Sequence, residues 1–356
     1  MKTATITLHD TDNCGSSLQA YALQCFLSNN GIENEIIDYV PTYTKNNGHP
    51  IKTFVRKIIY HKATRRREQK FASFVHNNLK LTKVHYTTLE QLRNNPPQAD
   101  CFITGSDQLW NSMYLCGKDP AFYLNFTAKK KIAYAVSVGR EQIPNSNLDI
   151  IKRNVKGFHW ISVREKTSVK QLDSLELESG QVQHVCDPVL LNPVQCYEKI
   201  RGERMCQEKY VLVYLAQDVD IQLLENYIQN LKNKLGAEIV FAGSYRRKCT
   251  CDYHFKDMSP SEFLSLIYYA DYIVSNSFHA TIFSLLYKKQ FATILPLENS
   301  IRIKDLLDTT GLSDRAITSE TIYSLTDITQ FRYDEIEGIL NAFREKSGNI
   351  LLGKLH

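Results

Sequence analysis

The sequence predicts an α/β protein with two doubly wound, Rossmann-like domains that face a cleft. Short apolar segments alternate with helical segments along the chain, which is the order of parallel sheets with crossover helices. The chain has 356 residues, which exceeds the size at which one hydrophobic core usually keeps growing. A charged segment with an Asn-Pro pair, residues 191–209, precedes a fresh apolar strand, so the alternation starts again there.

The first half of the chain carries the elements of one such domain. Leu18, Ala22 and Cys25 lie on one face of the first predicted helix, and Gly31 supplies a stop signal after its end. Pro41 closes the second predicted strand. We expect strands at residues 3–8, 35–40, 99–104, 131–138, 160–163 and 182–185, and helices at residues 16–29, 51–79, 87–93 and 168–175.

The second half repeats this order. We expect an N-terminal domain at residues 1–195 and a C-terminal domain at residues 205–330. The last segment, residues 331–356, is expected to form a helix that packs back on the N-terminal domain. The predicted strands are residues 210–215, 237–242, 272–275 and 291–294, and the predicted helices are residues 221–235, 260–269, 280–287, 301–309 and 333–346.

The composition is that of an ordinary globular protein. Hydrophobic residues at 43% and charged residues at 23% argue against disorder. A formal net charge of +5 is too small to indicate a dedicated nucleic-acid binder, so no nucleic-acid partner is expected. The nine cysteines lack the spacing of a disulfide framework or a complete zinc site, which favours a reducing cytoplasm and no bound metal. No apolar run approaches the ~20 residues that cross a bilayer.

The first polar cluster follows the first predicted strand. Asn13, Gly15 and Ser16 stand where a helix begins, and the free N–H groups there can bind an anion or a sugar hydroxyl. The alternative is that Asn13 or Ser16 only caps the helix.

The second cluster follows the predicted strand at residues 99–104. Its polar side chains beside an aromatic ring suit a sugar, whose hydroxyls bind Asp, Gln and Asn and whose ring stacks on Trp. The alternative is a turn that places the tryptophan in the core. The candidate residues are Gly105, Ser106, Asp107, Gln108, Trp110 and Asn111.

Two further strand ends carry charged or titratable residues. Arg164 with Glu165 and Lys166 could clamp a carboxylate or phosphate, or form a surface ion pair of little energetic weight. The segment Asn276, Ser277 and His279 places a histidine between a strand end and a helix start, where it can move protons near neutral pH. A buried structural histidine is the alternative there.

Residues 52–67 form a basic segment that ends in Arg65, Arg66 and Arg67. Such a run is typical of a solvated helix face. A peripheral contact with a membrane surface or an anionic polymer is the alternative.

Taken together, these segments resemble the polysaccharide pyruvyl transferase family. The resemblance implies a fold like that of the GT-B glycosyltransferases. It also implies transfer of pyruvate from phosphoenolpyruvate onto a sugar diol, which forms a cyclic ketal and releases phosphate. The motifs run in family order: Asn13-Cys14-Gly15 with LQAYALQ at 18–24, GSDQLWN at 105–111, AYAVSVG at 133–139, ISVREKTSVKQL at 161–172, DPVLL at 187–191, SNSFHATIFSLLYKKQF at 275–291, and Arg302 with DLLDTTGLSDR at 305–315.

The resemblance also implies roles for individual residues. His279 matches the family's histidine and is expected to protonate the enol carbon. Arg164 matches an arginine implied in phosphoenolpyruvate binding, and Asp107 is the third catalytic candidate.

One position departs from the pattern of some family members, which carry Arg-Leu-His where this chain has Ser277-Phe278-His279. The anion clamp is therefore expected from Arg164, Arg302, Lys166 or helix N-termini.

The leading interpretation is a bacterial enzyme of exopolysaccharide biosynthesis that acts in the cytoplasm, at the inner face of the membrane. Phosphoenolpyruvate is its expected co-substrate, a lipid-linked or nucleotide-linked sugar its acceptor, and no cofactor is expected. A GT-B-type glycosyltransferase that uses a nucleotide sugar is one alternative. A catalytically silent carbohydrate-binding relative is another.

Overall fold

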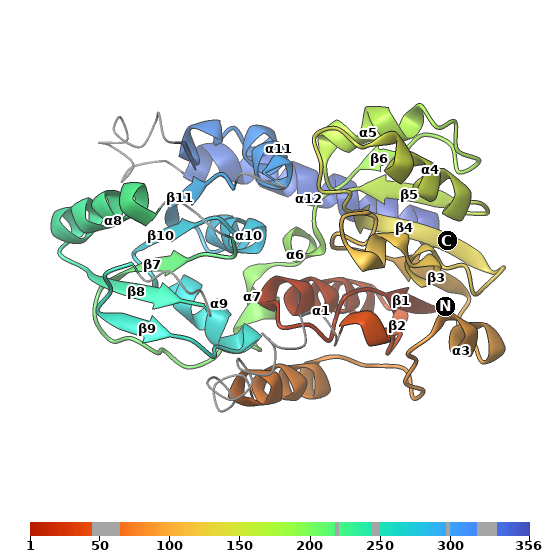
Figure 1. The fold of residues 1–356 in the computed structure, drawn as a ribbon, viewed down its shortest axis with the longest axis horizontal. Helices are drawn as coiled ribbons and strands as arrows, with labels where there is room; N and C mark the ends of the chain where they lie inside the picture. Colours follow the sequence, from red (N-terminus) through yellow and green to blue (C-terminus); the bar gives the residue numbers. More distant parts are fainter. Residues whose placement is uncertain (45–64, 218–220, 244–248, 297–299, 319–332) are drawn as a thin grey trace, which may run out of the picture. The chain divides into compact units, whose positions relative to one another are not determined.

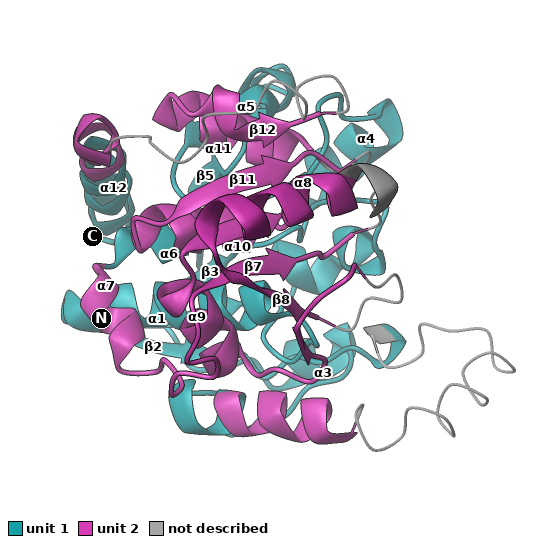
Figure 2. Cartoon of the chain, turned by 90° about the vertical axis from the view of Figure 1, so that its left-hand side faces the viewer, with its two compact units in different colours: residues 1–61, 75–192, 342–356 teal, residues 62–74, 193–341 magenta. Residues whose placement is uncertain are grey.

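The computed structural model describes residues 1–44, 65–217, 221–243, 249–296, 300–318 and 333–356. The chain divides into two compact units, which Figure 2 shows in different colours. Unit 1 comprises residues 1–61, 75–192 and 342–356, and unit 2 comprises residues 62–74 and 193–341. Both are α/β units with parallel sheets, so the predicted fold class is confirmed.

The described part of unit 1 contains a six-stranded parallel sheet with the order β2-β1-β3-β4-β5-β6 (Figure 1). Its central strands are buried on both faces, which explains their nearly continuous apolar sequences. The strands are β1 (Lys2–Ile6), β2 (Glu33–Ile36), β3 (Cys101–Thr104), β4 (Lys130–Val136), β5 (Trp160–Val163) and β6 (Gln183–His184).

Short helices connect these strands. One further helix, residues 65–78, begins in unit 2 and ends in unit 1. The others are α1 (Cys14–Asn29), α3 (Leu89–Asn94), α4 (Asn145–Asn154), α5 (Lys166–Asp173) and α6 (Pro188–Leu191), with 3-10 turns η1 (Thr42–Thr44), η2 (Leu115–Lys118) and η3 (Pro120–Tyr123).

The described part of unit 2 contains a second six-stranded parallel sheet, with the order β12-β11-β10-β7-β8-β9. The strands are β7 (Tyr210–Tyr214), β8 (Glu238–Ala242), β9 (Tyr253–Phe255), β10 (Tyr272–Ser275), β11 (Gln290–Ile294) and β12 (Ala316–Ile317). The helices are α7 (Val194–Glu198), α8 (Ile221–Leu235), α9 (Pro260–Tyr269), α10 (Phe278–Leu286) and α11 (Ile301–Thr310), with the 3-10 turn η4 (Ser313–Arg315).

The last helix, α12 (Tyr333–Leu355), is longer than predicted and contributes to both units. Its residues from 342 onward belong to unit 1. There Arg344 donates a hydrogen bond to the Leu190 carbonyl, and the Ser347 hydroxyl accepts one from the Cys186 N–H.

Some predicted elements need correction. The predicted helix at 51–79 is described only from residue 65, and most of the basic segment lies outside the described residues. Within that segment, Arg65 and Arg66 are exposed, while Arg67 lies over the Phe71 ring at 5.4 Å. Helices α4, α6 and α7 and the two edge strands β9 and β12 have no counterpart among the predictions. No helix among the described residues is both long and apolar enough to cross a membrane.

Candidate functional site

Three of the four polar motifs lie at the topological switch points of the two sheets, and the Arg164 motif follows β5. In unit 1 the chain runs from β1 to β2 on one side and from β3 to β6 on the other, so the loops after β1 and β3 diverge from neighbouring strand ends. In unit 2 the loops after β7 and β10 diverge in the same way. Ligands of open α/β sheets usually bind at such points, outside the carboxyl ends of the strands.

The loop after β1 is fixed by its own polar groups. The Asn13 side chain accepts hydrogen bonds from the Gly15 and Ser16 N–H groups, so Asn13 caps α1 as the structural alternative predicted. The Ser16 hydroxyl instead reaches across the switch point and donates to the Asp107 carboxylate at 2.5 Å. The first polar cluster is therefore joined to the second through Ser16.

Gln19 is a residue of this site that the sequence analysis missed. Its buried amide group donates to the Thr7 hydroxyl at 2.8 Å and accepts from the Ser106 N–H at 3.0 Å. It thereby ties the loop after β1 to the loop after β3. The sequence could have indicated this role, because Gln19 is three residues after Ser16 and both side chains therefore lie on one face of α1.

The loop after β3 is compact and internally hydrogen-bonded. The Asp107 carboxylate accepts from the Gln108 N–H, and the Asn111 amide donates to the Gln108 side chain at 2.9 Å. Gly105 has φ +124°, and a Cβ atom there would lie 2.0 Å from the Tyr134 carbonyl oxygen. Only glycine fits at this position without a shift of the backbone.

The prediction that Trp110 stacks on a sugar is wrong for this structure. Its ring is fully buried, stacked on Tyr123 with centroids 5.3 Å apart and meeting Phe158 edge-on at 6.0 Å. Burying an indole in an aromatic core is strongly favourable, so the alternative of a core tryptophan holds.

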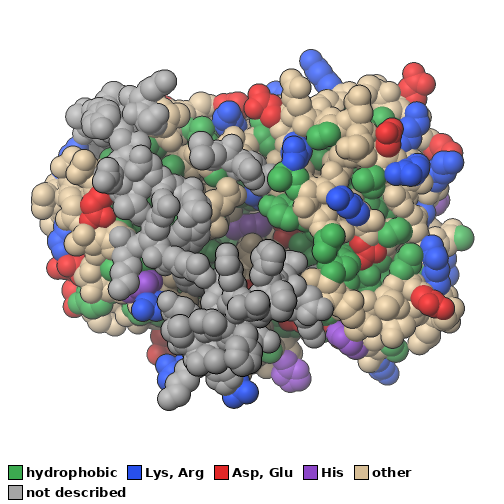
Figure 3. All heavy atoms as spheres, in the orientation of Figure 1, with side chains coloured by type: hydrophobic (Ala, Val, Ile, Leu, Met, Phe, Trp, Pro, Cys, Tyr) green, Lys and Arg blue, Asp and Glu red, His purple; other side chains and the backbone are tan. Residues whose placement is uncertain are grey.

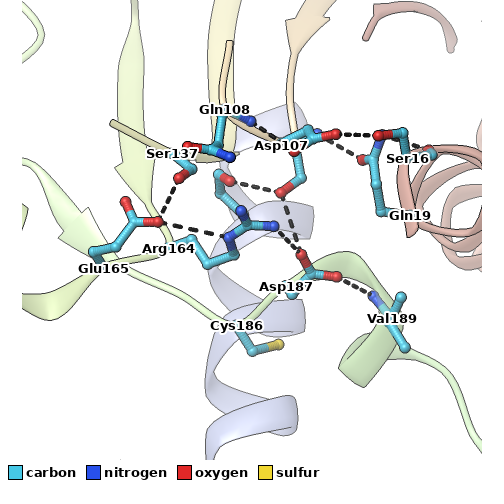
Figure 4. A network of polar contacts seen from close by, with 12 residues as sticks. Ser16, Gln19, Asp107, Gln108, Ser137, Arg164, Glu165, Cys186, Asp187 and Val189 are labelled. Atoms are coloured by element: carbon cyan, nitrogen blue, oxygen red, sulfur yellow. Dashed lines mark hydrogen bonds and ion pairs between the residues drawn. The ribbon is translucent and has the colours of Figure 1, made fainter. Parts of the chain in front are cut away.

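Arg164 lies in a buried polar network, which Figure 4 shows. Its guanidinium contacts the Asp187 carboxylate at 2.6 Å and lies 3.7 Å from Glu165. Burial alone would lower the pKa of this guanidinium, but the charges of Asp187, Glu165 and Asp107 outweigh it and raise the pKa. The ion pair between Arg164 and Glu165, which was predicted at the surface, is therefore buried. Lys166 is exposed at the start of α5.

The carboxylates of this network also hold other elements. Glu165 accepts from the Ser137 hydroxyl at 2.5 Å, and Asp187 caps α6 by accepting from the Val189 N–H at 3.0 Å. Asp107, Glu165 and Asp187 together carry more negative charge than Arg164 offsets. This part of unit 1 therefore suits hydroxyl donors better than a second anion.

The switch point of unit 2 centres on the residues after β10. The Asn276 side chain accepts from the Ala216 and Gln217 N–H groups at 2.7 and 3.2 Å, which fixes the loop after β7. Ser277 caps α10 by accepting from the Ala280 N–H. His279 lies in the first turn of α10 and is only 6% exposed.

Arg302 and His279 both lie against the ring of Phe278. The Arg302 guanidinium of α11 is 5.6 Å from the centroid of the Phe278 ring, and the His279 ring meets the same phenyl ring edge-on at 5.3 Å. Ser277 cannot supply a positive charge, but Arg302 brings one next to Phe278. Helix N–H groups and a guanidinium together suit an anionic ligand.

The predicted site residues thus fall into two groups. Ser16, Asp107, Arg164 and Glu165 are brought together within unit 1, and His279 and Arg302 within unit 2. Asn276 holds the loop after β7 by a hydrogen bond, and Ser277 caps α10. No group of His, Cys, Asp and Glu side chains that could hold a metal ion occurs among the described residues. On the face drawn in Figure 3, positive and negative side chains are interspersed.

Comparisons with known proteins identify the family and the fold. The family model described as polysaccharide pyruvyl transferase matches residues 13–296. A comparison with curated proteins finds no significant match. Among solved structures, the chain is similar to UDP-GlcNAc 2-epimerase from Neisseria meningitidis bound to UDP-GlcNAc, with 11% identity, a TM-score of 0.58, and coverage of 100% of this chain and 99% of the other.

Two other structures extend this likeness. UDP-GlcNAc 2-epimerase from Methanocaldococcus jannaschii, in complex with UDP-GlcNAc and UDP, has 14% identity and a TM-score of 0.55 over 100% of this chain and 99% of the other. The glycotransferase of kitacinnamycin has 11% identity and a TM-score of 0.52 over 99% and 98%. At these identities the likeness shows the fold alone, and it confirms the GT-B-like architecture.

Replacing Gly105 with alanine should destabilise unit 1. Backbone strain at a positive φ and a clash with the Tyr134 carbonyl each cost about 1–3 kcal/mol, so we expect a loss of about 3 kcal/mol or more. Both tryptophans of the chain, Trp110 and Trp160, lie in unit 1, so their fluorescence during urea unfolding reports on this unit. Gly180→Ala is the control, because Gly180 has φ +78° but open space around it. Equal midpoints for the two variants would contradict the close approach at Gly105.

Removing the negative charge of Asp187 should also destabilise unit 1. Asp187→Asn keeps an oxygen to cap α6 but leaves the buried Arg164 guanidinium without its nearest counter-charge. We expect a loss of about 3 kcal/mol in the same fluorescence assay, because an uncompensated buried charge is costly. Lys80→Met, which breaks an exposed pair with Glu33, is the control and should leave the midpoint nearly unchanged. An Asp187→Asn protein as stable as the wild type would show that this ion pair does not hold the network together.

Proposed function

Since the chain belongs to the polysaccharide pyruvyl transferase family, we propose that it transfers the pyruvyl group of phosphoenolpyruvate to two hydroxyls of a sugar. The product is a cyclic ketal, and phosphate is released. The acceptor is a lipid-linked or nucleotide-linked precursor of a surface polysaccharide. In this proposal the enzyme works in the cytoplasm, at the inner face of the membrane.

The observation that carries the proposal is the position of His279. It lies in the first turn of α10, at the switch point of the second sheet, and both His279 and the Arg302 guanidinium lie against the Phe278 ring. The positive end of the helix and the guanidinium attract the carboxylate and phosphate of phosphoenolpyruvate. The imidazolium of His279 then donates its proton to the methylene carbon, which becomes the methyl group of the ketal.

The acidic network of unit 1 fits the acceptor sugar. In our proposal Asp107, held by Ser16, takes a proton from an attacking hydroxyl. The first hydroxyl oxygen bonds to the central carbon of the pyruvyl group, the bond from that carbon to the phosphate oxygen breaks, and the second hydroxyl oxygen bonds in its place. Two hydroxyl protons are lost, of which one restores His279 and one leaves with phosphate. The reaction balances without any cofactor.

Arg164 takes a different role in this proposal from the one that the resemblance implies. Its guanidinium forms ion pairs with Asp187 and Glu165 inside unit 1. We therefore propose that Arg164 is a positioning residue that fixes these carboxylates, and that Arg302 supplies the cation for the donor.

The test is phosphate release from phosphoenolpyruvate in the presence of nucleotide-linked and lipid-linked sugars that carry a free diol. His279→Gln keeps a polar side chain of similar size but cannot donate a proton near neutral pH. We expect a fall in the rate of about 100-fold or more, the range of lost general acid catalysis. His76→Gln changes an exposed histidine of the helix at residues 65–78 and serves as the matched control, with an unchanged rate.

Three results would count against the proposal. His279→Gln could release phosphate as fast as the wild type. The wild type could release nucleoside diphosphate from a nucleotide sugar and no phosphate from phosphoenolpyruvate, which indicates a glycosyltransferase. It could also bind sugars without turnover of either donor, which indicates a silent carbohydrate-binding relative.

A further inference from the structure

A second cluster of cations and aromatic rings lies in unit 2, at the edge of the sheet opposite His279. It consists of Arg201, Tyr268, Tyr287 and Lys289, which we call the Tyr268 cluster. Tyr268 lies at the end of α9, before β10 begins, and Lys289 lies just before β11. Both positions are at the amino ends of strands, whereas His279 follows the carboxyl end of β10.

The two cations share one aromatic ring. The Arg201 guanidinium carbon is 3.6 Å from the centroid of the Tyr268 ring, and the Lys289 ammonium nitrogen is 5.5 Å from it. The Tyr287 ring meets Tyr268 edge-on, with centroids 5.2 Å apart. Contact with a ring face offsets part of the cost of bringing like charges together, but it satisfies no hydrogen bond.

Several donors of the cluster have no acceptor among the described residues. The Tyr287 side chain is only 8% exposed, and its hydroxyl is buried without a hydrogen-bond partner. One terminal nitrogen of Arg201, Nη1, is also buried without a hydrogen-bond partner. Neither Arg201 nor Lys289 forms an ion pair with any described carboxylate. Buried polar groups in folded proteins nearly always have a partner, so unpartnered donors of this kind indicate a missing acceptor.

The charged groups around the Tyr268 cluster are compatible with a negatively charged ligand. Burial has the largest effect on the pKa of the Lys289 ammonium group and lowers it. The negative charge of Asp271 raises this pKa and the positive charge of Arg201 lowers it, so that the net shift is downward. Asp271 accepts a hydrogen bond from the Tyr210 N–H, and Glu198, an exposed residue, lies near Tyr287. Burial also raises the pKa of the Tyr287 hydroxyl, which therefore stays a neutral donor at physiological pH.

We propose that the Tyr268 cluster binds a phosphate group through Arg201, Tyr287 and Lys289. The cluster offers donors of three kinds and two positive charges, which match the several acceptor oxygens and the negative charge of a phosphate. Arg204 contributes charge only at a distance, because it is held by the carbonyls of Cys206 and Gln207. The site is separate from the candidate active site: Tyr287 follows His279 by eight residues along α10, or about 12 Å of helix.

The first test is thermal unfolding with increasing inorganic phosphate, against sodium chloride of equal ionic strength. We expect phosphate to raise the melting temperature of the wild type to a saturating value. Lys289→Met and Tyr287→Phe should lose this rise. Tyr287→Phe keeps the ring and removes only a hydroxyl without a partner, so without phosphate it should melt no lower than the wild type.

Two controls separate this site from others. Lys288→Met removes the neighbouring charge, which is exposed and paired with Glu337 at 2.9 Å, and should keep the rise. Arg302→Met affects the candidate active site, where phosphate would be a product, and should also keep it. A rise that persists in Lys289→Met and Tyr287→Phe, or that is lost only in Arg302→Met, would overturn the proposal, as would no rise in the wild type.

The second test distinguishes a lipid headgroup from free phosphate. Sedimentation with phosphatidylcholine vesicles, with and without phosphatidic acid, measures binding to a membrane-borne phosphate group. Vesicle binding that depends on phosphatidic acid and is lost in Lys289→Met supports the site and assigns a headgroup as its ligand. A phosphate-dependent rise in melting temperature without vesicle binding supports the site with a soluble ligand. Vesicle binding that Lys289→Met and Tyr287→Phe leave unchanged would count against it.

Discussion

The buried ion pair between Arg164 and Asp187 is the interaction on which the architecture of unit 1 most depends. It joins the end of β5 to the start of α6, and Asp187 is also 3.5 Å from the Ser106 hydroxyl in the loop after β3. Ser106 is in turn held by Gln19 of α1. A guanidinium buried to this degree is tolerated only with counter-charges around it, so these loops have to keep their geometry together.

In unit 2, hydrogen bonds between neutral groups, rather than a buried ion pair, hold the loops after β7 and β10 together. Asn276 holds the loop after β7 by three hydrogen bonds, and helix α10 begins directly behind it. These contacts use an amide side chain and backbone groups, which carry no formal charge. In the proposed reaction the acidic network of unit 1 binds the sugar hydroxyls, and Arg302 with the start of α10 binds the anionic donor.

The sequence predicted those features that depend on local patterns. Apolar runs followed by polar residues located the strand ends at residues 105–111 and 276–279, and the alternation of segments predicted two parallel sheets. Features set by tertiary packing could not be predicted in this way. Trp110 is in the core because Tyr123 and Phe158 surround it, and Arg164 is buried because Asp187 lies beside it. The strand β12 has only two residues, too few for a periodic pattern.

We propose that a proton donor of unit 2 converts the methylene carbon of phosphoenolpyruvate into the methyl group of a ketal. The most direct measurement is nuclear magnetic resonance of the acceptor after reaction in deuterated water. We expect a new pyruvate ketal on the sugar whose methyl group carries one deuterium, formed together with inorganic phosphate. An unchanged acceptor, with phosphoenolpyruvate left intact or hydrolysed only to pyruvate, would contradict it.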